Sequence, residues 1–171
     1  MGSRHANADE VGTGAVTIGV DLGGTKVEAA VVTSSGEIVG GSRRATGAER
    51  GPEGVMATLT ACVLDGCLPE LSDPVAAVGI GVAGQVDPAA GTVLHAPNLR
   101  WDDFPLQARL RERLNMPVFV LNDVQAATYG EWTHGVGQGV DDLVTLFVGT
   151  GVGGGVISGG QLLRGCSGSG G

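Results

Sequence analysis

The order of hydrophobic and polar residues predicts that the chain begins with β-strands. Hydrophobic side chains alternate with small or polar ones over residues 16–22, the period-2 pattern of a strand with one buried face. Two more β-rich segments follow after short turns, so we expect a three-stranded antiparallel meander. From Pro52 the apolar spacing becomes that of a helix, which we expect to end near Gly66.

The remaining elements alternate between strands and helices. Nearly continuous apolar segments at 75–82 and 118–121 predict strands buried on both faces. The expected elements are strands 16–22, 27–33, 38–39, 75–82, 118–121, 143–148 and 156–157, a hairpin at 86–95, and helices at 52–66, at 106–114 and from 123 to about 132.

This order, βββαβαβα followed by a β-hairpin, predicts a mixed α/β fold with a partly parallel sheet. We interpret residues 1–14 as a disordered lead-in and residues 15–142 as a first domain. Residues 143–171 then form the opening hairpin of a second domain, which is too small for a core of its own.

Composition and charge narrow the class of protein. The chain has 171 residues, of which 42% are hydrophobic, so it has enough apolar material for a core. Ten Lys and Arg against 18 Asp and Glu give a net charge of −8, which argues against binding to nucleic acid or to an anionic membrane. The three cysteines lack disulfide or metal spacing, and we find neither a signal peptide nor a transmembrane segment, so we expect a cytoplasmic protein.

The first candidate site is the turn DLGGTK at 21–26, between two expected strands. Glycine lets backbone N–H groups approach an anion, and the Thr25 hydroxyl can donate to a phosphate oxygen. The Asp21 carboxylate can orient Mg²⁺ directly or through water. The alternative is an ordinary hairpin turn, in which Asp-x-Gly-Gly is common.

A second glycine cluster, GTGVGGG at 149–155, also follows an apolar strand. A plain hairpin does not need five glycines in seven positions, so close approach of the backbone to a ligand explains the cluster better. Two such loops suggest two domains that hold one polyphosphate between them.

The pair Asn122-Asp123 is the third candidate. It lies at the carboxyl end of an expected strand, where open α/β sheets bind ligands, although Asn and Asp are also good helix N-caps. The segment GIGVAG at 79–84 fits the dinucleotide-binding pattern, but the residues that follow cannot readily start the helix that this pattern needs.

Five segments resemble the motifs of the ROK family, which comprises bacterial sugar kinases and related repressors. They occur in the family's order and extend over nearly the whole chain. They are VDLGGTK (20–26), AGQVD (83–87), APNL (96–99), LND (121–123) and GTGVGGG (149–155).

The resemblance implies an actin-like, ribonuclease-H-like fold of two domains with ATP in the cleft. It also implies phosphoryl transfer from MgATP to a hexose hydroxyl, with Asp123 as the catalytic base. The sugar-binding residues would be Gly84, Asn98, Asn122 and Asp123. The ATP and phosphate ligands would be Asp21, which also serves Mg²⁺, with Gly23, Gly24, Thr25, Lys26, Gly149, Thr150, Gly151, Gly153 and Gly154.

The chain departs from the family pattern at its end. Family members continue with a Glu-apolar-Gly-His segment that completes the sugar pocket, and later with a cysteine-rich motif for structural Zn²⁺; neither is in these residues. We therefore expect a kinase cut off within its second domain, weakly active or inactive alone. Relatives often dimerise, so the resemblance is compatible with a homodimer of a full-length protein.

Two other functions are compatible with the resemblance. A sugar-binding ROK repressor needs a helix-turn-helix module, for which the residues before the first strand are too few. The other possible function is that of a non-catalytic half-kinase that binds sugar or phosphate. The sequence leaves the sugar open among glucose, mannose, fructose and N-acetylmannosamine.

Overall fold

The computed structural model describes residues 14–149 and 152–165, together with Gly168 and Gly170. The expected lead-in therefore lies almost entirely outside the described residues. Thr150 and Gly151, two of the expected phosphate ligands, also lie outside the described residues.

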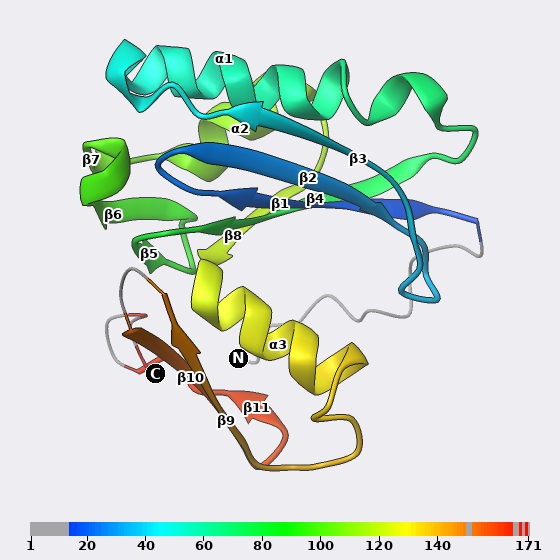
Figure 1. The fold of residues 1–171 in the computed structure, drawn as a ribbon, viewed down its shortest axis with the longest axis vertical. Coiled ribbons are helices and arrows are strands. Elements are labelled where there is room, and N and C mark those ends of the chain that lie inside the picture. The colour runs from blue at the N-terminus through cyan, green and yellow to red at the C-terminus, as the bar shows by residue number, and fades with distance from the viewer. Residues whose placement is uncertain (1–13, 150–151, 166–167, 169, 171) are drawn as a thin grey trace, which may run out of the picture.

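A five-stranded sheet forms the centre of the fold (Figure 1). The antiparallel meander is confirmed, because β2 pairs with both β1 and β3, and β4 and β8 extend the sheet in parallel with β1. The strand order is β3-β2-β1-β4-β8, with β1 at Val16–Leu22, β2 at Lys26–Val32, β3 at Ile38–Ala45, β4 at Val75–Val82 and β8 at Val118–Asn122.

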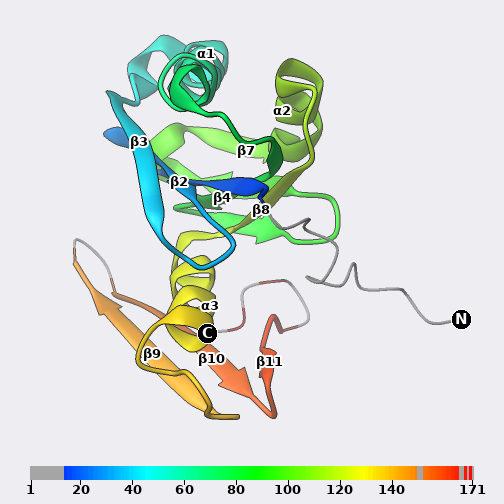
Figure 2. The same ribbon diagram turned by 90° about the vertical axis from the view of Figure 1, so that its right-hand side faces the viewer.

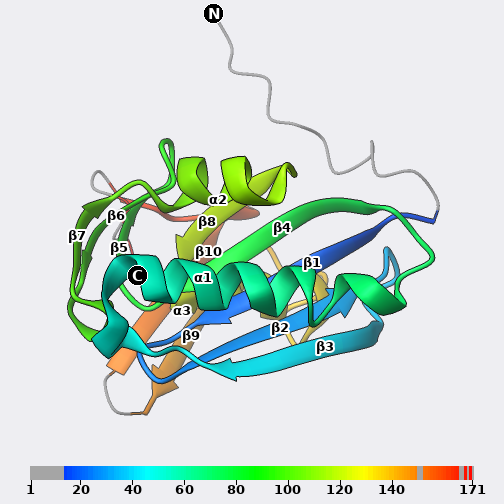
Figure 3. The same ribbon diagram turned by 90° about the horizontal axis from the view of Figure 1, so that it is seen from above.

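Helices lie on both faces of this sheet. Helices α1 (Gly51–Leu64) and α2 (Leu106–Leu114) lie side by side over one face (Figure 3), and α3 (Asp123–His134) lies on the other. The core forms between the sheet and the α1–α2 layer, because alternate side chains of each strand point to that layer. Its largest fully buried members include Ile18, Leu22, Met56, Leu59, Leu99, Trp101, Leu106 and Leu110.

The expectation that β4 and β8 are buried on both faces was wrong. Val78, Ile80 and Val82 are buried on the α1–α2 side, whereas Gly79 is exposed on the other side and Phe119 of β8 is 58% exposed. The reason is that α3 covers only part of this second face. Among the described residues, the rest of the face is open.

A small sheet follows β4. Strands β5 (Gln85–Asp87), β6 (Thr92–Ala96) and β7 (Trp101–Phe104) are antiparallel, so the expected hairpin gains a third strand. Because β5 rather than a helix follows β4, the dinucleotide-binding pattern at 79–84 lacks the structural context that it requires. In the described part of the chain, the 3₁₀ helices η2 (Ala48–Arg50) and η3 (Leu68–Glu70) flank α1, and η4 (Pro97–Leu99) connects β6 to β7.

A third sheet packs against α3 (Figure 2). It contains β9 (Leu143–Val148), β10 (Val152–Ser158) and β11 (Gln161–Leu162) in the order β11-β10-β9. The return strand thus begins at 152 rather than 156, and a third strand extends the expected hairpin. None of the helices in the described part of the chain is long and apolar enough to cross a membrane.

Candidate functional site

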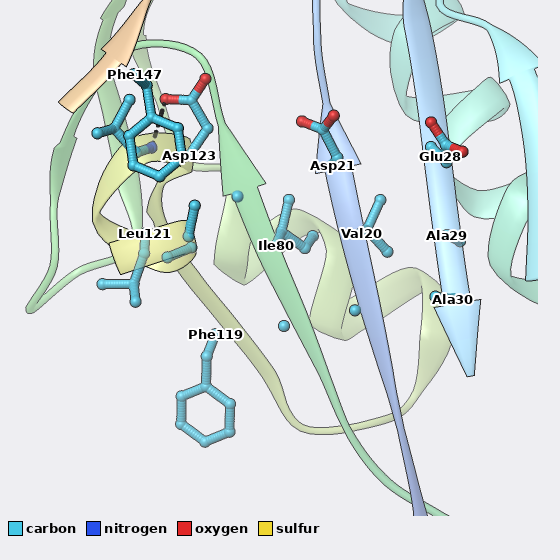
Figure 4. Close-up of a pocket in the computed structure, with 16 residues that line it drawn as sticks. Val20, Asp21, Glu28, Ala29, Ala30, Ile80, Phe119, Leu121, Asp123 and Phe147 are labelled. Atoms are coloured by element: carbon cyan, nitrogen blue, oxygen red, sulfur yellow. Dashed lines mark hydrogen bonds between the residues drawn. The ribbon is translucent and has the colours of Figure 1, made fainter. Parts of the chain in front are cut away.

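Two aspartates from separate elements meet at the carboxyl edge of the central sheet. Asp21 lies near the end of β1, Asp123 opens α3 directly after β8, and β4 runs between and parallel to these two strands. Both aspartates line a pocket of about 780 Å³ on the open face of the sheet. They lie at one end of this pocket with Glu28, and Phe119 lies at the other end (Figure 4).

The glycine between the two aspartates keeps this end of the pocket open. Gly81 of β4 is the register partner of Asp21 on one side and of Leu121 on the other. A Cβ at Gly81 would approach the Asp123 Cα to 3.3 Å, so a side chain here would press against the start of α3.

The carboxylates around this pocket differ in their charge environments. Burial raises the pKa of Asp21, the negative charges of Asp123 and Glu28 raise it further, and Lys26 lowers it. Lys26 Nζ donates to Glu28 Oε2 at 2.7 Å, and this hydrogen bond lowers the pKa of Glu28. Asp21 therefore carries its charge at a cost that a bound cation would offset.

Asn122 holds the Asp123 side chain in place. Asn122 Oδ1 caps α3 by accepting from Gln125 N at 3.1 Å, and Asn122 Nδ2 donates to Gly84 O at 3.0 Å and to Asp123 Oδ1 at 2.9 Å. Asp123 Oδ1 also accepts from Val124 N at 2.9 Å. The N-cap role and an oriented carboxylate thus occur together.

A second pocket of about 260 Å³ lies beside these hydrogen bonds. Gln125, which is 4% exposed, donates from Nε2 to Gly168 O at 2.9 Å and to Gly170 O at 3.1 Å. The pocket is lined by Gly84, Gln85, Asn122, Val124, Gln125, Gly153, Gly154, Gly168 and Gly170.

Thr46 holds the turn between β1 and β2, and Asn98 lies close to this turn. The fully buried Thr46 donates from Oγ1 to Gly23 O at 2.7 Å and from its backbone N to Thr25 O at 3.0 Å. A Cβ at Gly24 would come within 2.8 Å of Asn98 Cβ. The structure thus brings two predicted motifs together, and their close approach explains why residue 24 is glycine.

Comparison with known proteins identifies the family, because the family model described as "ROK family" matches residues 17–171. The chain belongs to the ROK family. The glucokinase of Streptomyces coelicolor is 39% identical over 150 residues, which are 88% of this chain and 46% of that protein. The xylose repressor of Caldicellulosiruptor bescii is 39% identical over 100 residues, which are 58% of this chain and 25% of the repressor.

A solved structure supports the same assignment. The ROK family glucokinase from Streptomyces griseus, in complex with glucose and AMPPNP, superposes with a TM-score of 0.82 at 44% identity. The match covers 90% of this chain and 48% of that one, so this ROK chain spans about half the length of the glucokinases that it matches. The predicted actin-like ATPase fold is confirmed.

The structure groups six of the predicted ROK site residues around two pockets, whereas the turn residues Gly23, Gly24, Thr25 and Lys26 line neither pocket. Asp21 and Asp123 share the larger pocket, and Gly84, Asn122, Gly153 and Gly154 line the smaller one. Asn98 lies beside Gly24 and lines neither pocket. Gly149 also lines neither pocket, and a Cβ there would have open space within 4 Å.

Part of the second glycine cluster has a structural explanation. Gly153 and Gly155 belong to strand β10, and not to a loop. A Cβ at Gly153 would lie 2.8 Å from a Val124 methyl carbon, and one at Gly155 would clash with Thr128. Close packing of β10 on α3 therefore accounts for these two glycines without a ligand.

Three residues around the site were not predicted from the sequence. Glu28 could have been found, because strand alternation places it on the same face as Lys26, two residues earlier. The roles of Thr46 and Gln125 depend on contacts with residues 23 and 43 positions away, which no local pattern reports.

The residues of the larger pocket suit the Mg²⁺ that the family implies. Mg²⁺ prefers oxygen ligands and takes few from the protein, because water and substrate phosphates supply the rest. Asp21 offers a carboxylate whose raised pKa reflects burial and neighbouring negative charge, so a cation there would be stabilised.

Proposed function

We propose that this chain carries the sugar-binding and part of the phosphate-binding site of an ATP-dependent hexose kinase of the glucokinase type. The observation that carries the proposal is the pairing of Asp21 and Asp123 in one pocket, with Asn122 holding Asp123. Phosphoryl transfer needs mainly positioning and charge stabilisation, and these groups can provide both.

Asp123 is the base in this proposal. Asn122 and the Val124 amide hold Oδ1, so we assign Oδ2 to the sugar hydroxyl, whose proton it accepts during attack on the terminal phosphate. A positioned base of this kind contributes a factor of about 10²–10⁴ to the rate. Gly84, Asn98 and Asn122 would bind the sugar.

The phosphates of ATP would lie against two segments. Gly23, Gly24, Thr25 and Lys26 form the first, and the Lys26 ammonium would exchange its Glu28 partner for a phosphate oxygen. The other segment contains Gly149, Thr150, Gly151, Gly153 and Gly154. Asp21 would hold Mg²⁺, directly or through water, and the ion would neutralise charge on the transferred group.

A sugar-binding repressor is the second candidate, supported by the similarity to the xylose repressor. We favour the kinase because the S. coelicolor glucokinase is 39% identical over 88% of the chain, whereas the putative xylose repressor of Caldicellulosiruptor sp. is 33% identical over the same share. The net charge of −8 also disfavours DNA binding by these residues.

The first test is an ADP-release assay of the 171-residue chain with glucose, mannose, fructose and N-acetylmannosamine. We expect weak or absent turnover, because the chain spans only about half of its kinase relatives. Robust sugar-dependent turnover would contradict this expectation.

The decisive test is a chimera in which residues 17–171 replace the aligned part of the S. griseus glucokinase. We expect it to phosphorylate a hexose, and we expect Asp123→Asn to lower kcat about 10²–10⁴-fold. The matched control is Asp73→Asn, at an exposed loop position outside both pockets. A folded chimera that is inactive, or one that keeps full activity after the Asp123→Asn substitution, refutes the proposal.

A further inference from the structure

Arg50 joins helix α1 to the turn between β1 and β2. It occupies the N-cap position of α1, but its side chain does not cap the helix. Arg50 Nη2 instead donates to Thr58 Oγ1 of α1 at 2.6 Å and to Thr46 O at 3.2 Å. Thr46 in turn bonds to Gly23 O and Thr25 O of the turn. A continuous path of hydrogen bonds therefore leads from α1 through Arg50 and Thr46 to the turn.

Arg50 supplies the donor for a carbonyl that the fold buries. Thr46 is fully buried, and its backbone N–H and its hydroxyl already donate to the turn. A buried carbonyl that loses its donor costs free energy comparable to that of a lost hydrogen bond. Because Thr46 also bonds to Gly23 O and Thr25 O, loss of the Arg50 guanidinium would loosen the two bonds that hold the turn.

Glycine at position 47 leaves room for the guanidinium. A Cβ at Gly47 would clash with Nη2, Nε and Cζ of Arg50. Gly47 also has a φ of 67°, in the left-handed region that favours glycine. Arg50 N donates to Gly47 O at 3.0 Å and closes the short segment between Thr46 and Arg50. The backbone of this segment is thus shaped so that the arginine side chain folds back over it to reach the Thr46 carbonyl.

The Arg50 side chain makes these hydrogen bonds in place of an ion pair. Its neighbour Arg44 lines the same surface pocket of about 450 Å³ between β3 and α1, and Arg44 Nη2 lies 3.9 Å from Asp65 Oδ2. Arg50 forms no ion pair among the residues that the structure describes. Hydrogen bonds with an ionised donor are about twice as strong as those between neutral groups, so the guanidinium is an effective anchor for the Thr46 carbonyl.

The turn has little stiffness of its own. Gly23 and Gly24 lack side chains, and glycine loses more conformational freedom on ordering than any other residue. Within the turn, Gly23 N donates to Lys26 O at 3.0 Å. Backbone N–H groups bind an anion well when they already point together, because ordering them during binding costs affinity. Contacts from outside the turn therefore contribute to the affinity of this segment for phosphate.

We propose that Arg50 is a positioning residue for the segment 23–26, which it fixes through Thr46 before a polyphosphate binds. Arg50 does not contact the phosphates in this proposal, and it acts by transmitting the packing of α1 to the turn. The identity of the polyphosphate as ATP rests on the proposed function, whereas the fixing of the turn by Arg50 does not.

The first measurement is hydrogen exchange in the 171-residue chain, at the backbone N–H groups of Thr46 and Gly23 that form hydrogen bonds in and around the turn. Arg50→Gln should speed exchange at both groups by about 2–10-fold, the factor that corresponds to loss of one net hydrogen bond. Arg44→Gln is the matched control, because it removes the same charge from the same pocket but leaves the Thr46 carbonyl bonded. The control should change these two rates by at most about twofold.

A second pair of variants tests the path from α1. Thr58→Val removes the hydroxyl that accepts from Arg50, together with its own bond to Gly54 O at 3.1 Å. Thr60→Val is the matched control, since Thr60 Oγ1 donates to Met56 O at 2.8 Å in the same i-to-i−4 arrangement but has no bond to Arg50. Thr58→Val should speed exchange in the turn, and Thr60→Val should not. Circular dichroism checks the fold, and this pair decides the test if Arg50→Gln does not fold.

The second measurement uses the chimera with the S. griseus glucokinase. Arg50→Gln should raise the KM for ATP by about 2–10-fold and leave the KM for the hexose unchanged, because the turn lies on the phosphate side of the proposed site. A role in stability alone would lower the melting temperature without separating these two constants.

Each outcome decides the proposal. Unchanged exchange at Thr46 and Gly23 after Arg50→Gln, or an equal increase after Arg44→Gln, overturns it. An active chimera whose KM for ATP is the same with and without Arg50→Gln also overturns it. An inactive chimera contradicts the kinase function, and the exchange rates then decide on their own whether Arg50 positions the turn.

Discussion

Replacing Gly84 by alanine tests the packing that positions the proposed sugar-binding side of the site. A Cβ at this residue would lie 2.7 Å from His95 O and 2.8 Å from Ala96 Cβ. Both obstacles belong to the backbone or Cβ atoms of β6, which is held between β5 and β7, so neither can rotate away. Either β6 or the segment before β5 must move.

The expected cost follows from this geometry. Forcing an extra methyl group into a packed site costs about 1–3 kcal/mol. For a chain of this size, about 1 kcal/mol corresponds to a fall of about 2–4 °C in melting temperature. The Gly84 carbonyl, which accepts from Asn122 Nδ2 at 3.0 Å, would shift as well, so we also expect weaker sugar binding.

The assay is thermal unfolding followed by circular dichroism, with Gly79→Ala as the matched control. Gly79 lies in β4, where a Cβ would meet nothing within 4 Å, and alanine there should stabilise the chain by about 0.5–1 kcal/mol. The two substitutions should therefore shift the melting temperature in opposite directions. A Gly84→Ala chain that melts at or above the wild-type temperature would refute the reasoning.

Three further predictions concern the same region. Asp21→Asn should raise the melting temperature near neutral pH, because the pKa of Asp21 is raised in the folded chain and the ionised carboxylate therefore destabilises it. The gain in melting temperature should shrink as the pH falls through the pKa of Asp21 in the folded chain. An equal gain at all pH values would contradict this cause. Asn122→Ala should lower stability by about 0.5–2 kcal/mol through loss of the α3 N-cap, measured by urea unfolding. Asn122→Ser, which keeps a capping oxygen and adds no charge beside Asp123, should lose less. Gln125→Leu removes the side-chain amide that donates to the Gly170 carbonyl. Hydrogen exchange at the backbone N–H of Gly170, which donates to Arg164 O, should therefore become faster. Unchanged exchange would contradict this role of Gln125.

Most helices and strands follow from local patterns, and the exceptions show what these patterns lack. Strand β1 alternates clearly, and α2 has leucines spaced by four, so both were predicted close to their observed bounds. Strand β7 was missed because its sequence WDDF has two adjacent aspartates between its buried ends. Its pairing with β6 and the stacking of Trp101 on Phe104 at 4.2 Å are contacts outside the local pattern.

Glycine shows the same division within the site. The sequence marks the positions where the backbone must approach something closely, but it does not say what. At Gly24 the neighbour is Asn98, and at Gly153 and Gly155 it is helix α3, so part of the predicted phosphate signal has its cause in packing. The division of the chain into domains at 142 and 143 stays a prediction.

The residue types of the site could be predicted from sequence, because Asp21 and the Asn122-Asp123 pair each end a hydrophobic strand, and strand ends are local features. Their meeting in one pocket depends on strand order, since β4 inserts between β1 and β8 and turns all three carboxyl ends to one edge. The exposure of Val144, Leu146 and Val148 on β9 is likewise a property of the folded chain. A strand such as 143–148 shows that it is apolar, but only the elements packed around it determine which of its faces meets water.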